Sequence, residues 1–138
     1  MRIIVDANVL ISSALVSDSV PKRVFTIVSL QHTLLRSAES LKELQRVVYK
    51  EKFNKYFSVH PELREELVLS YLEIGRTVDI THRVDICRDR KDNIYLELAL
   101  SGKADLIISG DSDLLVLNPF EGIPIIKPVE FLNKYQNA

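Results

Sequence analysis

Glycine and cysteine are scarce in this chain, and each scarcity excludes a class of site. Only four of the 138 residues are glycine, and none forms the glycine-rich loop that cradles phosphates in nucleotide-binding enzymes. The single cysteine, Cys87, cannot form a disulfide within the chain. Such cysteine usage is typical of a protein in a reducing compartment, so we expect a cytoplasmic location.

Long apolar runs and an excess of one charge are also missing. No stretch approaches the roughly 20 apolar residues of a membrane helix, and no cleavable signal follows Met1-Arg2, so we expect no membrane association. The formal net charge is −1, which leaves no global basic field for nucleic acid; any such site must be a local patch. The three histidines have no partners at the spacing of a Ser-His-Asp arrangement.

The remaining composition is that of an ordinary globular domain. Hydrophobic residues make up 46% of the chain and charged residues 27%, and the length suits one domain over residues 1–138. Strand-like segments alternate with helical ones throughout. This alternation predicts a three-layer α/β/α sandwich around a parallel sheet of four to five strands. The expected strands are residues 3–5, 32–36, 77–80, 104–109 and 123–126; residues 50–58 and 128–135 are expected to be helical.

Acidic residues stand where the predicted elements meet. Asp6 follows the apolar run at residues 3–5, and Asp111 follows the run at 106–108. Asp92 begins a predicted helix, and Glu43 lies within another. Carboxyl ends of parallel strands and the helix starts that follow them share one edge of a sheet. Four acids from four elements are therefore predicted to meet in one pocket.

Each acid also has an ordinary explanation. Aspartate is a favoured helix cap and turn residue, and Glu43 could lie on a solvated helix face. Like charges in one pocket repel each other, so a shared pocket requires a cation. Oxygen ligands without histidine or cysteine suit Mg²⁺ or Mn²⁺, and such ions activate water and stabilise the leaving oxygen in phosphodiester cleavage.

Two groups of basic residues are candidates for nucleic-acid binding. Arg88, Arg90 and Lys91 precede Asp92 and are possible RNA-binding residues, although the acids beside them dilute their charge. The segment at residues 50–57 interleaves lysines with aromatic rings. A solvated face whose aromatic rings turn inward is the simpler explanation of that second group.

Four stretches, in order, resemble the PIN-domain nucleases, especially the toxins of VapBC-like toxin–antitoxin systems. They are Ile4-Val5-Asp6-Ala7-Asn8-Val9-Leu10, Leu41-Lys42-Glu43-Leu44, the segment from Arg88 to Ala99, and the segment from Ala104 to Leu115. The resemblance covers nearly the whole chain. It implies an acidic quartet at Asp6, Glu43, Asp92 and Asp111 that binds Mg²⁺ or Mn²⁺. It also implies a homodimer and a small antitoxin partner.

Supporting residues are expected beside these acids. Where the family usually has threonine before the Gly-Asp pair, this chain has Ser109, whose hydroxyl is expected to support the acids. Asn8 is expected to orient them, and Asp113 is expected as a supporting residue or extra ligand.

We therefore expect a metal-dependent endoribonuclease acting on single-stranded or structured RNA, as the toxin of a toxin–antitoxin pair. Alternatives are an RNA- or protein-binding domain without cleavage activity, and a housekeeping RNA-processing nuclease. A small phosphatase is disfavoured, because such enzymes pair a nucleophilic aspartate with a second aspartate two residues on, and this chain has Asn8 there.

Overall fold

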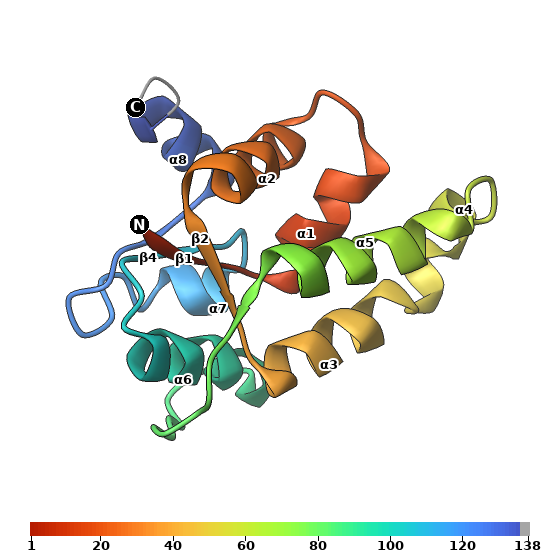
Figure 1. Ribbon diagram of the computed structural model, residues 1–138. Helices are drawn as coiled ribbons and strands as arrows, with labels where there is room; N and C mark the ends of the chain where they lie inside the picture. The colour runs from red at the N-terminus through yellow and green to blue at the C-terminus, as the bar shows by residue number, and fades with distance from the viewer. Residues whose placement is uncertain (136–138) are drawn as a thin grey trace.

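A five-stranded parallel sheet lies at the centre of the computed structural model, which describes residues 1–135 (Figure 1). The strands follow the spatial order β3-β2-β1-β4-β5, and every neighbouring pair is parallel. They are β1 (Arg2–Val5), β2 (Thr33–Arg36), β3 (Arg76–Thr77), β4 (Leu106–Ile108) and β5 (Ile125–Ile126). The predicted parallel sheet is confirmed.

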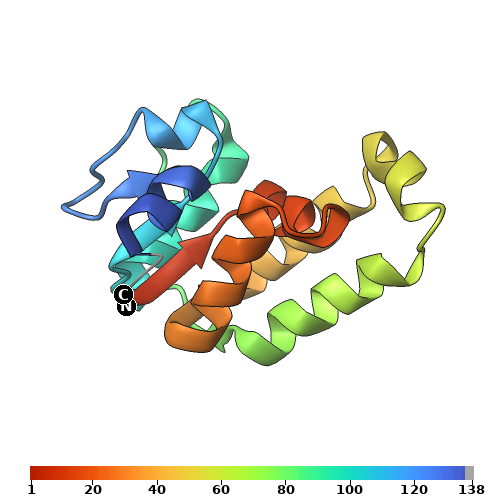
Figure 2. The same ribbon diagram turned by 90° about the horizontal axis from the view of Figure 1, so that it is seen from above.

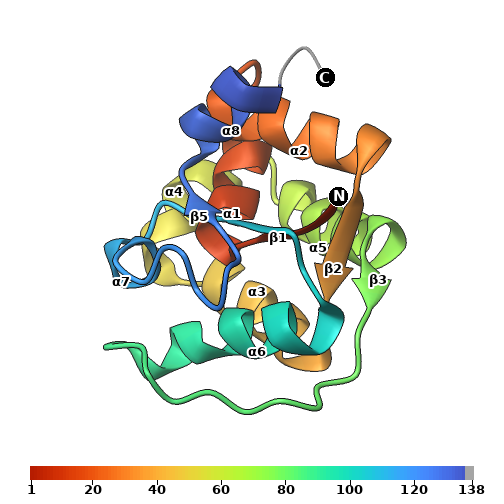
Figure 3. The same ribbon diagram turned by 90° about the vertical axis from the view of Figure 1, so that its left-hand side faces the viewer.

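Helices cover both faces of this sheet, because side chains along each strand alternate between the faces. Ile3 and Val5 of β1 pack on one face, and Ile4 packs on the other. The first face is covered by α1 (Ala7–Leu15), α2 (Val20–Gln31), α3 (Ala38–Val48), α5 (Glu62–Ile74) and α8 (Pro128–Tyr135). The second is covered by α6 (Asn93–Gly102) and α7 (Ser112–Leu115). Figure 3 shows α6 across the sheet from α2 and α8, which confirms the three-layer sandwich.

Local capping explains where the helices on the first face begin. Asp6 and Ser19 each accept a hydrogen bond from a backbone N–H in the first turn of α1 and α2, respectively. Ser37 and Ser40 exchange side-chain and backbone hydrogen bonds as a capping box at the start of α3. These hydroxyls and carboxylates satisfy amide donors that a helix start leaves without partners.

The segment at residues 50–58 is helical but broken. It forms the short 3₁₀ helix η1 (Glu51–Phe53) and then α4 (Asn54–Phe57). Figure 2 shows α3 and α5 running out from the sheet, with the α4 segment at their far end. Phe57 is fully buried there, whereas the Tyr56 side chain is half exposed.

The strand predicted at residues 77–80 is wrong in its extent. β3 spans Arg76–Thr77 only, and the chain then leaves the sheet after the Val78 N–H donates to the Arg36 carbonyl at 2.8 Å. Val78 and Ile80 pack instead against the core under α6. Burying these side chains against α6 therefore outweighs extending an edge strand. The segment from Val78 to Asp89, which we call the strap, connects β3 to the 3₁₀ helix η2 (Arg90–Asp92).

Within residues 1–135, no helix is both long and apolar enough to cross a membrane.

Candidate metal centre

Three carboxylates lie together at the carboxyl edge of the sheet. Val5 of β1 is aligned with Ile108 of β4, so the residues that follow both strands leave the sheet side by side. Asp92, Asp111 and Asp113 each place one carboxylate oxygen within 4.8 Å of the other two. We call this group the carboxylate cluster. Its spacing suits oxygen ligation of a hard divalent ion.

Asp6 lies beside the cluster and is almost fully buried, with 3% of its surface exposed. The Ser109 hydroxyl donates a hydrogen bond to Asp6 Oδ2, and the Val9 N–H donates to Oδ1 at 2.9 Å. Burial raises the pKa of Asp6, and the Ser109 bond opposes that rise. The Ser109 oxygen also accepts from the Asp111 N–H at 3.0 Å, so one hydroxyl fixes Asp6 relative to Asp111.

Asp92 carries the least satisfied charge of the site. Its Oδ2 is buried and has no hydrogen-bond partner among the described residues. Loss of solvent, followed by the interaction with Asp111, raises the pKa of Asp92 from 3.8 to about 7. A buried carboxylate oxygen without a donor is costly. A cation bound between Asp92 and Asp111 would remove both the missing contact and the repulsion, so these residues fit a divalent ion.

Asp113 belongs to the carboxylate cluster and also forms an ion pair with Arg88. Arg88 donates from Nε and Nη2 to its two carboxylate oxygens at 2.8 and 2.9 Å, and this pairing lowers the pKa of Asp113. The Asp113 N–H in turn donates to Asp111 Oδ1 at 2.9 Å. Asp113 therefore balances part of the negative charge with Arg88 while it holds the Asp111 carboxylate in place.

Glu43 lies apart from the carboxylate cluster. Arg46, one helical turn on, donates to its two oxygens at 2.6 and 3.1 Å. Both side chains line an open groove together with Lys42 and Lys91. The structure thus brings Asp6, Asp92 and Asp111 together and pairs Glu43 with a neighbouring guanidinium, so a ligand role for Glu43 stays a prediction.

Asn8 is exposed and lies beside the acids without a bond to them. Within residues 1–135 its side chain forms no hydrogen bond, but it lines a second groove of about 330 Å³. Gly110, Asp111 and Pro128 line the same groove. The orienting role predicted for Asn8 therefore stays a prediction.

Of the basic residues predicted to bind RNA, the two arginines lie beside carboxylates, and the lysine lines a groove. Arg88 is held by Asp113, and Arg90 lies 3.8 Å from Asp85. Lys91 lines the groove that contains Glu43. In η1, Lys52 lies over the ring of Phe53, and in α4, Lys55 lies over the ring of Tyr56, each 5.0 Å from the ring centroid.

Tyr95 supports the site and is not among the sequence-based candidates. Its hydroxyl accepts a hydrogen bond from the Ala7 N–H at 3.0 Å, directly after Asp6. Burial of this side chain raises its pKa, and the charge of Asp6 raises it further. Its position three residues after Asp92, and so on the same helix face, was the one signal that could have indicated it.

Asn93 fixes the strap that precedes the cluster. Its Oδ1 accepts hydrogen bonds from the N–H groups of Ile86 and Cys87 at 3.2 and 2.9 Å. The strap that carries Arg88 is thereby tied to the start of α6.

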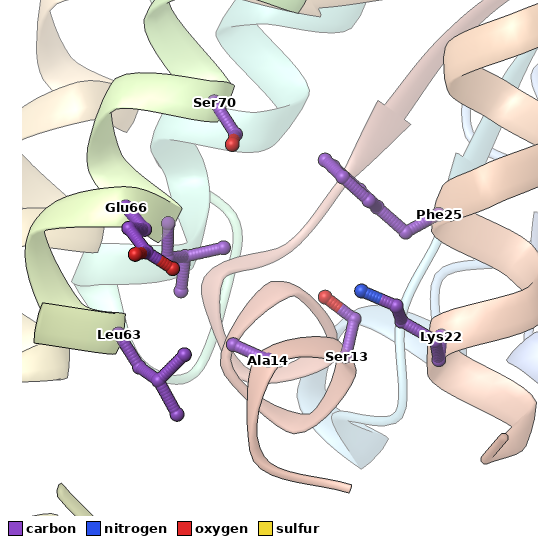
Figure 4. Close-up of a pocket in the computed structure, with 8 residues that line it drawn as sticks. Ser13, Ala14, Lys22, Phe25, Leu63, Glu66 and Ser70 are labelled. Carbon is purple, nitrogen blue, oxygen red and sulfur yellow. The ribbon is translucent and has the colours of Figure 1, made fainter. Parts of the chain in front are cut away.

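A separate, smaller pocket lies away from the acids. It is about 120 Å³ in volume and opens between α1, α2 and α5. Figure 4 shows Lys22 and Glu66 on opposite sides of it, with Ser13 between them. None of the predicted acids lines this pocket.

Comparison with known proteins identifies the family of this chain. The sequence model of the PIN domain matches residues 2–113. An uncharacterized protein of Methanocaldococcus jannaschii is 24% identical over 118 residues, which span 85% of this chain and 75% of the relative. The crystal structure of VapBC2 from Rickettsia felis bound to a DNA fragment from their promoter contains a chain with a similar fold. The TM-score is 0.63 at 12% identity, over 92% of this chain and 98% of that one. The chain described here belongs to the PIN domain family.

Proposed function

We propose that this protein is a metal-dependent endoribonuclease. The observation that carries the proposal is Asp92, whose buried Oδ2 has no hydrogen-bond donor within residues 1–135 and whose carboxylate lies in one cluster with Asp111 and Asp113. A site that served only to cap helices would satisfy this oxygen with a backbone amide. A site that binds a divalent ion leaves it free for the ion.

Asp92 and Asp111 are the residues we assign as metal ligands, with Asp6 and Asp113 beside them. A bound Mg²⁺ or Mn²⁺ supplies an activated water and charge stabilisation at the scissile phosphate. Oxygen ligands favour these ions over softer metals. Glu43 is proposed to complete the acidic set when the substrate draws Arg46 away from it.

The chain's own residues set the geometry for this chemistry. The Ser109 hydroxyl keeps Asp6 and Asp111 at a fixed separation by bonding to both. Tyr95 holds the backbone that follows Asp6, and Arg88 holds Asp113. Because outer hydrogen bonds orient metal ligands, we expect each of them to affect activity through ligand placement.

We further propose that the protein is the toxin of a toxin–antitoxin pair, forms a homodimer and is held inactive by a small antitoxin. The similarity to a chain of a VapBC complex supports this assignment. A short reading frame immediately upstream that encodes a protein able to bind this chain and inhibit cleavage would bear it out. A gene without such a neighbour favours a housekeeping RNA-processing nuclease.

The direct test is cleavage of a labelled RNA with Mg²⁺ or Mn²⁺ and with EDTA. We expect cleavage with metal, none with EDTA, and a loss of about a hundredfold or more in Asp6→Asn and Asp92→Asn. Asp79→Asn, an exposed aspartate outside the site, is the matched control and should keep full activity. Full activity in Asp6→Asn, or cleavage without metal, contradicts the proposal.

Calorimetry separates this proposal from a binding function without catalysis. The parent protein should take up a divalent ion, and Asp92→Asn should bind it at least about tenfold more weakly. An acid site that binds no divalent ion favours an RNA- or protein-binding domain. Thermal unfolding of each variant establishes that the site residue, and not the fold, accounts for any loss.

A further inference from the structure

Three arginines near the carboxylate cluster already have carboxylate partners. Arg88 pairs with Asp113, Arg90 with Asp85, and Arg83 with both Glu39 and Glu97. A phosphate that approached Arg88 would have to compete with a bidentate bond. These arginines are therefore poor candidates for the first contact with a polyanion.

Lysines without a carboxylate partner in the described residues lie in the groove between α3 and the start of α6. This groove is open and about 280 Å³ in volume. Lys42, Glu43 and Arg46 come from the α3 wall, and Lys91 comes from the opposite wall. Lys91 directly precedes Asp92 in the chain, so one wall of the groove adjoins the segment that carries a carboxylate of the cluster. We call it the lysine groove.

Positive charge continues past the end of α3. Lys42 and Arg46 lie one turn apart on α3, and Lys50 follows two residues after the helix ends at Val48. Burial lowers the pKa of Lys50, and the nearby charges of Arg46, Lys52 and Lys91 lower it further. Lys91, from a distant part of the sequence, therefore contributes to the same positive field.

The two glutamates of the groove do not cancel this field. Glu43 is paired with Arg46, and Glu39 lies 3.7 Å from Arg83. Within residues 1–135, no carboxylate lies at ion-pair distance from Lys42, Lys50 or Lys91. In a chain of net charge −1, three unpaired ammonium groups beside a carboxylate cluster favour a ligand with several negative charges in a row.

We propose that the lysine groove, through Lys42 and Lys91, and the neighbouring Lys50 bind the sugar-phosphate backbone of a single RNA strand and lead it onto the carboxylate cluster. This inference rests on the proposed nuclease function. A positively charged open groove that follows a backbone is the usual form of a single-strand site. The strand leaves past Asn8, through the groove that Asp111 shares with Pro128.

The test measures binding apart from cleavage. Each lysine is changed to glutamine in the parent and in an Asp92→Asn background. Anisotropy of a labelled uridine oligomer of about 12 nucleotides is recorded in EDTA at several salt concentrations. We expect each Lys→Gln variant to bind roughly three- to fivefold more weakly, with a salt dependence lower by about 0.7 for each lost phosphate contact. Arg23→Gln is the matched control, because Arg23 is exposed on α2 and lines neither of the two grooves. Figure 3 shows α2 across the sheet from α6.

The outcomes separate this inference from the nuclease proposal. If the parent cleaves RNA while the lysine variants bind with unchanged affinity and salt dependence, the groove assignment is wrong and the nuclease proposal stands. If the parent cleaves nothing while the variants lose binding as expected, the groove stands and the nuclease proposal is wrong. Equal loss in Arg23→Gln also overturns the assignment, because binding then follows total charge. Circular dichroism of each variant shows whether it is folded.

Discussion

Ser109 donates its hydroxyl hydrogen to the buried carboxylate of Asp6, although the two residues are 103 positions apart in the sequence. They meet because β1 and β4 are parallel neighbours, and each residue directly follows its strand. The same oxygen accepts from the Asp111 N–H. One small side chain therefore ties together the ends of the two central strands and the acids they carry.

Replacing Ser109 with alanine should weaken both the fold and the site. The variant leaves Asp6 Oδ2 and the Asp111 N–H without this partner, and an unsatisfied buried group costs about 1–3 kcal/mol. The pKa of Asp6 should rise further, because the Ser109 bond now opposes the effect of burial. Urea unfolding measures the loss of stability, and RNA cleavage measures the loss of activity. Ser109→Thr keeps the hydroxyl and should retain most of the stability and most of the cleavage activity. If Ser109→Ala matched the parent in both measurements, the hydroxyl would contribute to neither the fold nor the site.

The stability of the metal-free protein should fall as the pH rises toward neutrality. The pKa of Asp92 is about 7 in the folded protein, against an ordinary value of 3.8. Because the folded state binds this proton more tightly, the stabilisation is complete below pH 3.8 and is lost as the pH rises through about 7. Urea unfolding at about pH 5 and about pH 8 in EDTA measures the change.

Asp92→Asn tests the source of that pH dependence. Asparagine carries no proton in this range, so the variant should be more stable than the parent at about pH 8, by about 2 kcal/mol after allowance for solvent screening. The two proteins should converge as the pH falls. Parallel curves for parent and variant would assign the pH dependence to other groups.

Replacing Tyr95 with phenylalanine should destabilise the protein through a single lost acceptor. The Ala7 N–H then lies buried without its bond to the tyrosine hydroxyl, at a cost of about 1–2 kcal/mol. Tyr135→Phe is the matched control, because Tyr135 stacks on Phe131 and its hydroxyl forms no hydrogen bond in the described residues. Similar urea midpoints for both variants would contradict the role given to Tyr95.

Replacing Arg88 with glutamine should strengthen divalent-ion binding. The change removes the cation that shares the charge of Asp113, so the cluster gains net negative charge where the ion binds. We expect Mg²⁺ affinity to rise by roughly threefold to fivefold in calorimetry at low salt. Arg90→Gln, which removes a looser surface pair with Asp85, should change the affinity less. Weaker Mg²⁺ binding in Arg88→Gln would mean that placement of Asp113 matters more than its charge.

Much of the fold could be predicted because the signals are local. The apolar runs that become β1 and β4 end in polar residues, and the alternation of strands and helices is sufficient for a parallel sheet. The strand predicted at residues 77–80 fails for a nonlocal reason. Whether Val78 and Ile80 pair with an edge strand or pack on α6 depends on where α6 lies, which no short pattern encodes.

The sequence by itself determined the central strands β1 and β4, the helix starts and the presence of acids at their junctions, because each depends on near neighbours along the chain. Tertiary structure decided which charges pair. Glu43 and Asp92 are similar carboxylates in the sequence, yet Glu43 meets Arg46 while Asp92 Oδ2 meets no donor within residues 1–135. Likewise, Arg88 bonds to Asp113, whereas Lys91 lines the groove and has no carboxylate at ion-pair distance in the described part of the chain. Such pairings depend on distances between elements, and only the packed sheet and its two helix layers set those distances.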